Sequence, residues 1–312
     1  MSPNIPTLLI VAALMAWSKT DRAAVTGQSG EPGDAARALA GAIDIHVHGY
    51  PDDRPRSIDA IEVAQLARTR GMRAIVLKNH YESTAGLAYL VRKVVPNIEV
   101  FGGIDLNLTV GGINPAAVAH MTRVSGGWGR VVWMSTFDAE NQVRYSKEHR
   151  PFVSVARNGD LLPEVKQVIA LIAKHGLVLA TGHVAPQEAF MLLGEARRRG
   201  VEHMVVTHAM NPPVLMSVSQ MQEAAKLGAF IEFVGGSLTG AEAEARMSRF
   251  ADAIRKIGPS SCILSSDLGQ QGNALPPDGL GAFLLAMRAK GFTEQEVSRM
   301  SKQNPARLLG LP

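Results

Sequence analysis

Short apolar runs alternate with amphipathic segments along the chain from residue 42 onward. The apolar runs are rich in Val and Ile, which is typical of buried parallel strands. The segments between and after them repeat apolar residues every three or four positions, which predicts helices that cross from one strand to the next. We expect eight strands, at 42–48, 73–78, 99–106, 130–134, 177–183, 203–208, 229–233 and 262–267. We expect helices at 58–70, 85–94, 115–123, 162–175, 187–199, 217–227, 241–256 and 279–290.

Eight strand–helix units in one chain favour a closed (β/α)8 barrel over an open doubly wound sheet. Glycine follows five of the predicted helices, as expected for left-handed C-caps before a strand. An open nucleotide-binding sheet would carry a glycine-rich fingerprint after its first strand, and none stands there. The sequence therefore predicts an α/β protein with a single TIM barrel at 38–312 and a short N-terminal extension at 1–37.

The N-terminal extension combines an apolar segment with a flexible linker. Thr7–Trp17 is an apolar run of eleven residues, too short for a membrane span of about twenty residues but long enough for a signal-peptide core. No Lys or Arg precedes this run and no typical cleavage site follows it, so a cytoplasmic protein without a stable membrane span is expected ahead of an exported one. An N-terminal helix that packs on the barrel and a misassigned start are the other interpretations. Residues 26–34 are rich in Gly, Ser and Pro, which is typical of a linker.

Composition excludes several classes of protein. With 46% hydrophobic and 19% charged residues in 312, the chain is globular and not disordered. The 32 basic and 28 acidic residues are spread along the sequence without a basic run, so nucleic-acid binding is not expected. Cys262 is the only cysteine, which excludes a disulfide within the chain, and its apolar surroundings predict a buried, inert thiol.

Four histidines and one aspartate stand where predicted strands end. His46 and His48 end the first strand, His183 the fifth, His208 the sixth and Asp267 the eighth. Taken singly, each is explained by core hydrogen bonding or loop capping. In a barrel, however, the carboxyl ends of all the strands meet at one mouth, so these five side chains are expected to converge. Neutral imidazole and carboxylate are ligands of divalent metals, and we expect one or two ions, Zn first and Mn or Fe as alternatives.

The same residues resemble the motifs of the amidohydrolase superfamily of metal-dependent hydrolases. Asp44-Ile45-His46-Val47-His48 is similar to its paired-histidine motif, His183 and His208 to its later histidines, and Asp267 to its aspartate after strand eight. The end of the chain, Asn304–Leu311, resembles its closing helix. The resemblance runs from Asp44 to Leu311, and residues 76–80 and 131–134 are similar to an uncharacterised branch, which implies a fold and a chemistry but no substrate.

The resemblance implies a hydrolase acting on a small molecule. A bound divalent cation lowers the pKa of its water toward about 7, so that hydroxide can attack an amide, a cyclic amide, a lactone or another ester. We expect His46, His48 and His183 to bind this metal. Asp267 is expected to be both a ligand and the general base, and His208 to bind either a second ion or the developing oxyanion.

Lys78 marks a departure from the binuclear members of the superfamily. Those proteins usually carry a carboxylated lysine or a glutamate after strand four, and residues 133–138 contain neither. Lys78, at the end of the second strand, is the only lysine at a predicted strand end. Either it reacts with CO2 and becomes an anionic metal ligand, or it remains an ammonium that binds a substrate carboxylate or an oxyanion. A mononuclear site needs no bridging ligand.

Two further side chains near strand ends have open roles. His80 either faces the mouth or makes hydrogen bonds at the rim, and Glu232 either orients a ligand histidine or pairs with a cation on the helix side. The remaining histidines are assigned to structure: His120, His149, His175 and His203.

The loops at the mouth offer candidate substrate contacts. Arg54 and Arg56 follow the first strand, where they either receive a substrate carboxylate or serve as surface charge. Residues 137–159 form a long polar insertion of the kind that covers binding sites. An aromatic wall is predicted from Trp133, Phe137, Tyr145 and Phe152.

Three rival functions fit the same barrel. A non-hydrolytic decarboxylase would use the metal to hold a substrate carboxylate. A phosphoesterase normally needs more acidic and histidine ligands than these strand ends supply. A barrel without activity that only binds a partner would lack tightly bound metal. A homodimer is the default expectation for the assembly.

Overall fold

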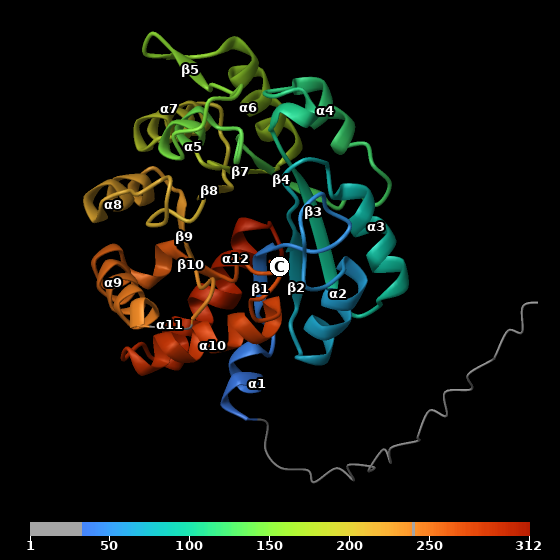
Figure 1. The fold of residues 1–312 in the computed structure, drawn as a ribbon, viewed down its shortest axis with the longest axis vertical. Coiled ribbons are helices and arrows are strands. Elements are labelled where there is room, and N and C mark those ends of the chain that lie inside the picture. The colour runs from blue at the N-terminus through green and yellow to red at the C-terminus, as the bar shows by residue number, and fades with distance from the viewer. Residues whose placement is uncertain (1–32, 239–240) are drawn as a thin grey trace, which may run out of the picture. The chain divides into compact units, whose positions relative to one another are not determined.

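The computed structural model describes residues 33–238 and 241–312, so the predicted apolar segment at 7–17 lies outside the described residues. Eight parallel strands form one sheet in the order β1 Ile43–Val47, β2 Ala74–Leu77, β3 Glu99–Asp105, β4 Gly129–Trp133, β7 Val178–Ala180, β8 Met204–Val206, β9 Phe230–Val234 and β10 Cys262–Ser265 (Figure 1). The His48 N–H donates to the Leu268 carbonyl, and the Asp267 N–H donates to the His46 carbonyl. These bonds join the last strand to the first and confirm the predicted TIM barrel.

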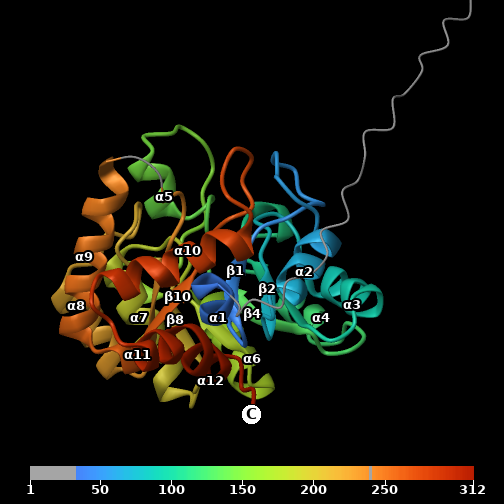
Figure 2. The same cartoon turned by 90° about the horizontal axis from the view of Figure 1, so that it is seen from below.

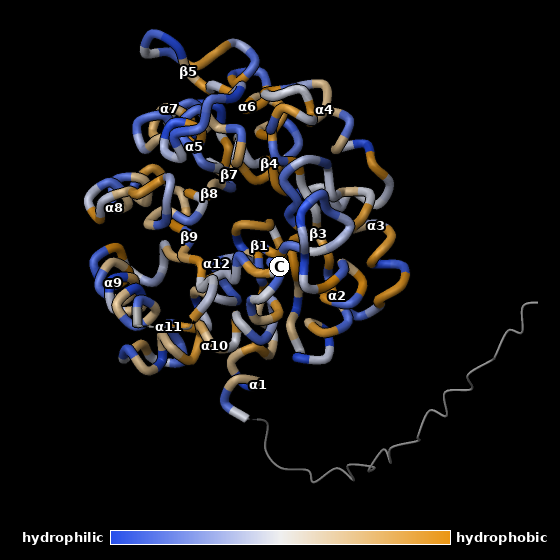
Figure 3. Tube along the Cα trace, in the orientation of Figure 1, coloured by the Kyte–Doolittle hydropathy of each residue, from blue (hydrophilic) through white to orange (hydrophobic). Residues whose placement is uncertain are grey.

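Helices surround the barrel and follow the predicted ranges to within three residues. They are α2 Ala60–Thr69, α3 Ala85–Val94, α4 Pro115–Met121, α6 Pro163–His175, α7 Pro186–Arg198, α8 Val218–Lys226, α9 Ala241–Ile257 and α10 Pro276–Ala289. Hydrophobic and hydrophilic residues alternate along these helices in Figure 3, as the amphipathic pattern predicts.

Several short elements are absent from the sequence prediction. The helix α1 Asp34–Leu39 lies against α10, and the 137–159 insertion folds into the helix α5 Glu140–Tyr145 and one strand of the hairpin β5 Ala156–Arg157 and β6 Asp160–Leu161. The others are η1 Leu108–Val110, η2 Pro259–Ser261, α11 Glu294–Ser298 and the π-helical turn η3 Arg299–Gln303. The helix α12 Asn304–Leu308 lies where the closing helix is expected from the sequence. Elements of two to six residues are too short to display a hydrophobic period.

The apolar core has two layers. One cluster fills the space between strands and helices, and a smaller one, which includes Ile43, Ile45, Phe101 and Trp133, fills the inside of the barrel. Cys262 is fully buried, and burial raises the pKa of its thiol, which agrees with an inert side chain. No helix in the described part of the chain is long and apolar enough to cross a membrane.

A β-bulge in β1 sets the direction of its histidines. Ile43 and Ile45 belong to the inner cluster and Val47 to the outer one, while the pairing with β2 shifts by one residue between Asp44 and Val47. The buried carboxylate of Asp44 accepts hydrogen bonds from the N–H of His46 (3.1 Å) and of Ser266 (3.0 Å). The extra residue lets Ile45 and His46 both face the interior, although they are adjacent in sequence.

Candidate metal centre

The site lies at the carboxyl ends of the strands. The loop after β1, α5 and the loop after β10 gather at one end of the barrel, and α12 and the C-terminus lie at the other (Figure 2). A cavity of about 420 Å³ opens there, a size that suits a small molecule. The five predicted strand-end residues all line it, together with His80, Arg54, Pro55, Arg56, Phe137, Gln142, Pro212 and Gln270.

His46, His48 and Asp267 form the centre of the site. The Asp267 Oδ1 atom lies 3.3 Å from His46 Nε2 and 3.1 Å from His48 Nε2, and the ligand atoms of the three residues lie within 4.8 Å of one another. Both histidines are buried, whereas the Asp267 side chain is 27% exposed to the cavity. Among the described residues, no hydrogen bond reaches Asp267 Oδ2. One carboxylate oxygen therefore faces the histidines and the other is free for a ligand.

Glu232, on β9, orients His46 from behind. Its Oε1 lies 3.1 Å from His46 Nδ1 and accepts from the Ser265 hydroxyl at 2.6 Å, and its Oε2 accepts from the His208 N–H at 2.9 Å. Because an ionised carboxylate only accepts, His46 carries its proton on Nδ1 and turns the lone pair of Nε2 toward Asp267. Of the two roles considered for Glu232, the structure has the one that orients a histidine.

We predict that Glu232→Gln weakens metal binding about 10- to 100-fold. The amide keeps the shape of the side chain but loses the negative charge that makes His46 Nε2 a stronger electron-pair donor to the metal. Competition with a chromophoric chelator measures the affinity for zinc. Glu188→Gln, a partly buried carboxylate at the start of α7, is the matched control and is expected to change nothing. Equal zinc affinity in Glu232→Gln and the wild type would contradict the orienting role.

His183 and His208 face each other across the mouth. Their Nε2 atoms are 3.0 Å apart, and the Nδ1 of His183 lies 2.8 Å from the Oε1 of Gln142, which α5 supplies. Gly182, with φ +64°, permits the turn before His183, since a Cβ there would lie 2.3 Å from the Met134 carbonyl oxygen. Gln142 was not predicted from the sequence, because α5 is too short to be seen as a helix.

Two of the site residues have a strained backbone. His208 has φ +26° and Asp267 has φ +52°, in the left-handed region that side chains with a Cβ avoid. Such conformations cost about 1–3 kcal/mol each and concentrate at functional sites. This strain energy is the cost of the backbone conformations that direct the side chains of His208 and Asp267 toward the cavity.

The donor set fits a divalent cation. With Nδ1 of His46 protonated, the lone pair of its Nε2 meets the lone pairs of Asp267 Oδ1, and this repulsion is relieved only by a second proton or a cation. Because Gln142 Oε1 accepts from His183 Nδ1, the lone pair of His183 stands on Nε2, where the Nε2–H of His208 can donate to it. Nδ1 of His48 and Nδ1 of His208 are buried without a hydrogen-bond partner among the described residues.

The electrostatics of the site keep three of its four strand-end histidines in the neutral form that binds metal. Burial lowers the pKa of His48 to about 3 and also lowers the pKa values of His183 and His208, so these imidazoles are neutral near pH 7. Burial opposes charge on His46 as well, but the carboxylates of Asp267 and Glu232 raise its pKa. Burial alone would raise the pKa of the Asp267 carboxyl, but His46 and His48 hold it well below the usual range.

Lys78 lies beside the centre in a buried polar network. Its side chain is fully buried, with Nζ 3.0 Å from Asp105 Oδ2, 3.5 Å from His80 Nδ1 and 5.4 Å from the centroid of the Trp133 ring. Thr136 donates its hydroxyl to the same Asp105 oxygen at 3.0 Å. Asp105 was not predicted as a site residue, although it is a charged residue at the end of the apolar strand β3, as the other site residues are at the ends of theirs.

The predicted aromatic wall is wrong for three of its four residues. Trp133 is buried inside the barrel below Lys78, and Tyr145 and Phe152 lie on the surface away from the cavity. Phe137 does line the cavity, with its ring centroid 4.1 Å from that of His80 and 5.6 Å from that of His183. The error arose because the fold of the 137–159 insertion, which places these side chains, is not visible in the sequence.

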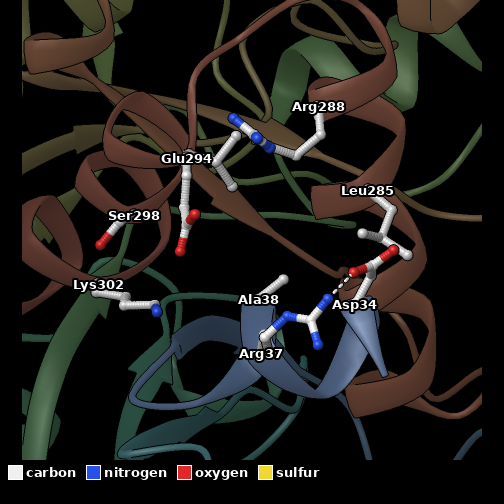
Figure 4. A pocket seen from close by; sticks show the side chains of 9 residues that line it. Asp34, Arg37, Ala38, Leu285, Arg288, Glu294, Ser298 and Lys302 are labelled. Atoms are coloured by element: carbon white, nitrogen blue, oxygen red, sulfur yellow. Dashed lines mark hydrogen bonds and ion pairs between the residues drawn. The ribbon is translucent and has the colours of Figure 1, made fainter. Parts of the chain in front are cut away.

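The histidines assigned to structure stay outside this cavity, and His80 faces it. A second cavity lies between α1, α10, α11 and η3 (Figure 4). None of the described residues that line it is a histidine or a cysteine, and two of its charged residues, Asp34 and Arg37, form an ion pair with each other. It therefore offers no comparable metal site.

Residues 41–232 match a protein family described as a family of unknown function (DUF6282), which is more than half of the chain. The chain belongs to the DUF6282 family. The matched region of this DUF6282 protein contains all four cavity histidines named at strand ends and Lys78, while Asp267 lies beyond it. No curated protein matches the sequence significantly.

Solved structures similar to this DUF6282 protein are barrels of the predicted type. An amidohydrolase from Pseudomonas aeruginosa has a TM-score of 0.60 at 13% identity, over 88% of this chain and 98% of that one. A zinc-bound amidohydrolase from Burkholderia multivorans has 0.59 at 14%, over 88% and 100%. The organophosphorus hydrolase from Deinococcus radiodurans has 0.56 at 17%, over 88% and 94%. At the level of the fold, the resemblance to amidohydrolases is confirmed.

Proposed function

We propose that this chain is a metal-dependent hydrolase that cleaves an amide, a cyclic amide, a lactone or another ester in a small molecule. The observation that carries the proposal is the convergence of His46 Nε2, His48 Nε2 and Asp267 Oδ1 at the wall of a cavity. Structural neighbours named as an amidohydrolase, an organophosphorus hydrolase and a protein engineered for organophosphate hydrolysis from a lactonase template support the same chemistry.

His46, His48, His183 and Asp267 would hold the metal, for which zinc is the first candidate. When bound, a divalent cation would supply a water that ionises near pH 7, and the cation itself would polarise the bond under attack. Asp267 is the general base, since its Oδ2 is free of partners among the described residues and its partly exposed side chain faces the cavity. His208 donates from Nε2 to the oxyanion that develops on the substrate.

Lys78 stays an unmodified ammonium in this proposal. Carboxylation would place a carbamate anion beside the Asp105 carboxylate, which is now 3.0 Å from Nζ, and like charges at that distance repel strongly in a buried site. Without a bridging carbamate, the site is expected to hold a single metal ion. Lys78 then helps to position His80, whose Nδ1 lies 3.5 Å from its Nζ.

The test is the metal content per chain of protein purified without chelator, followed by a hydrolysis screen. We expect one divalent ion and turnover of at least one lactone, ester or amide, with no carbamate signal in ¹³C NMR after incubation with ¹³C-bicarbonate. Two ions and a carbamate signal would replace the mononuclear site by a binuclear one. Decarboxylation products without hydrolysis, or no tightly bound metal after reconstitution, would overturn the hydrolase proposal.

A further inference from the structure

Arg54 lines the cavity as an exposed side chain without a direct ion pair. Among residues 33–238 and 241–312, no carboxylate lies within 4.0 Å of its guanidinium, although it lines the cavity beside the metal ligands. Its neighbour Arg56 differs, because it is buried and paired with Asp52, with Nε 2.7 Å and Nη2 2.5 Å from the same carboxylate oxygen. Arg56 therefore helps to shape the wall, whereas the charge of Arg54 is available to a ligand.

Aromatic side chains hold Arg54 in place. Its Cζ lies 4.2 Å from the centroid of the Phe137 ring and 5.5 Å from that of Tyr81, and its Nη2 donates to the Tyr81 hydroxyl at 2.8 Å. Phe137 in turn contacts His183. A guanidinium stacked in this way loses less side-chain freedom on binding than a free one, and its remaining N–H groups can still meet a carboxylate.

We propose that Arg54 binds a carboxylate of the substrate, so that the substrate is a small molecule with a carboxylate a few atoms from the bond that is cleaved. This inference rests on the proposed function and adds the class of substrate. One guanidinium without an ion pair matches the single charge of a carboxylate better than the nearly double charge of a phosphate monoester. The cation held by the histidines and Asp267 would add to the positive potential that draws such an anion.

The test uses two hydroxamates with the same four-carbon chain on the zinc-loaded full chain. Succinic monohydroxamate and butyrohydroxamate both present a metal-binding group, and they differ in a terminal carboxylate against a methyl. Titration calorimetry is expected to give about tenfold tighter binding for the carboxylate compound, a preference that Arg54→Gln removes and Arg54→Lys keeps in part. Arg68→Gln, which removes an exposed arginine at the end of α2, should keep the full preference.

Two results would overturn the carboxylate site: equal affinity for the two compounds in the wild type, or an unchanged preference in Arg54→Gln. Failure of the proposed function looks different, because then neither hydroxamate binds in a chelator-sensitive way. In that case glutarate is titrated into the chelator-treated chain. Binding that Arg54→Gln abolishes would support the carboxylate site, and absence of binding would overturn it.

Discussion

Asp267→Asn is expected to lower turnover of the best hydrolytic substrate about 100- to 10,000-fold while the protein keeps its metal. The amide oxygen can still contact a cation between His46 and His48, but it cannot accept a proton from water at neutral pH. His46 and His48 lower the pKa of Asp267, which keeps the wild-type carboxylate ionised at neutral pH. Rates are measured with metal content determined on the same samples.

The control for this substitution is Asp252→Asn, which makes the same chemical change on an exposed side chain of α9. It should leave turnover unchanged. If Asp267→Asn retained both its metal and its full turnover, another group would have to be the general base. If it lost the metal, its effect on the rate would report on ligation instead, and the base would then be sought by pH profiles of Asp267→Glu.

Lys78→Met is expected to destabilise the fold by about 3–5 kcal/mol, because it leaves the Asp105 carboxylate buried without its cation. Asp105→Asn should cost a similar amount by stranding the ammonium. The double variant removes both charges and should cost less than either single variant, since the methionine fills the space and the amide can still accept from Thr136. Free energies of unfolding in urea measure all three.

The unfolding free energies of these three variants also report on the chemical state of Lys78. A carbamate next to Asp105 would form a like-charge pair. Lys78→Met would then remove a repulsion and would not destabilise the fold by about 3–5 kcal/mol. Simple addition of the two single costs would show that the two side chains do not interact. Lys256→Met, on an exposed position of α9, should stay within about 0.5 kcal/mol of the wild type.

The sequence predicted what depends on periodicity and missed what depends on the register between distant strands. In β2 the interior residues alternate as Ala74, Val76 and then Lys78, so the place of this lysine follows from the pattern alone. Its partner Asp105 and the contact of Glu232 with His46 require knowing how β2 meets β3 and how β9 meets the first strand. No single-sequence pattern carries that information.

The offset within β1 has a consequence for the history and engineering of this site. Because inward and outward positions exchange with every single residue, losing one residue between Asp44 and Val47 would turn either the two isoleucines or the two histidines away from the barrel axis. Substitution can therefore alter the ligands one at a time, whereas a change of length alters them all together. A designer who transplants His46 and His48 into another barrel must carry over Asp44 with them, since its carboxylate holds the bulged peptide in place.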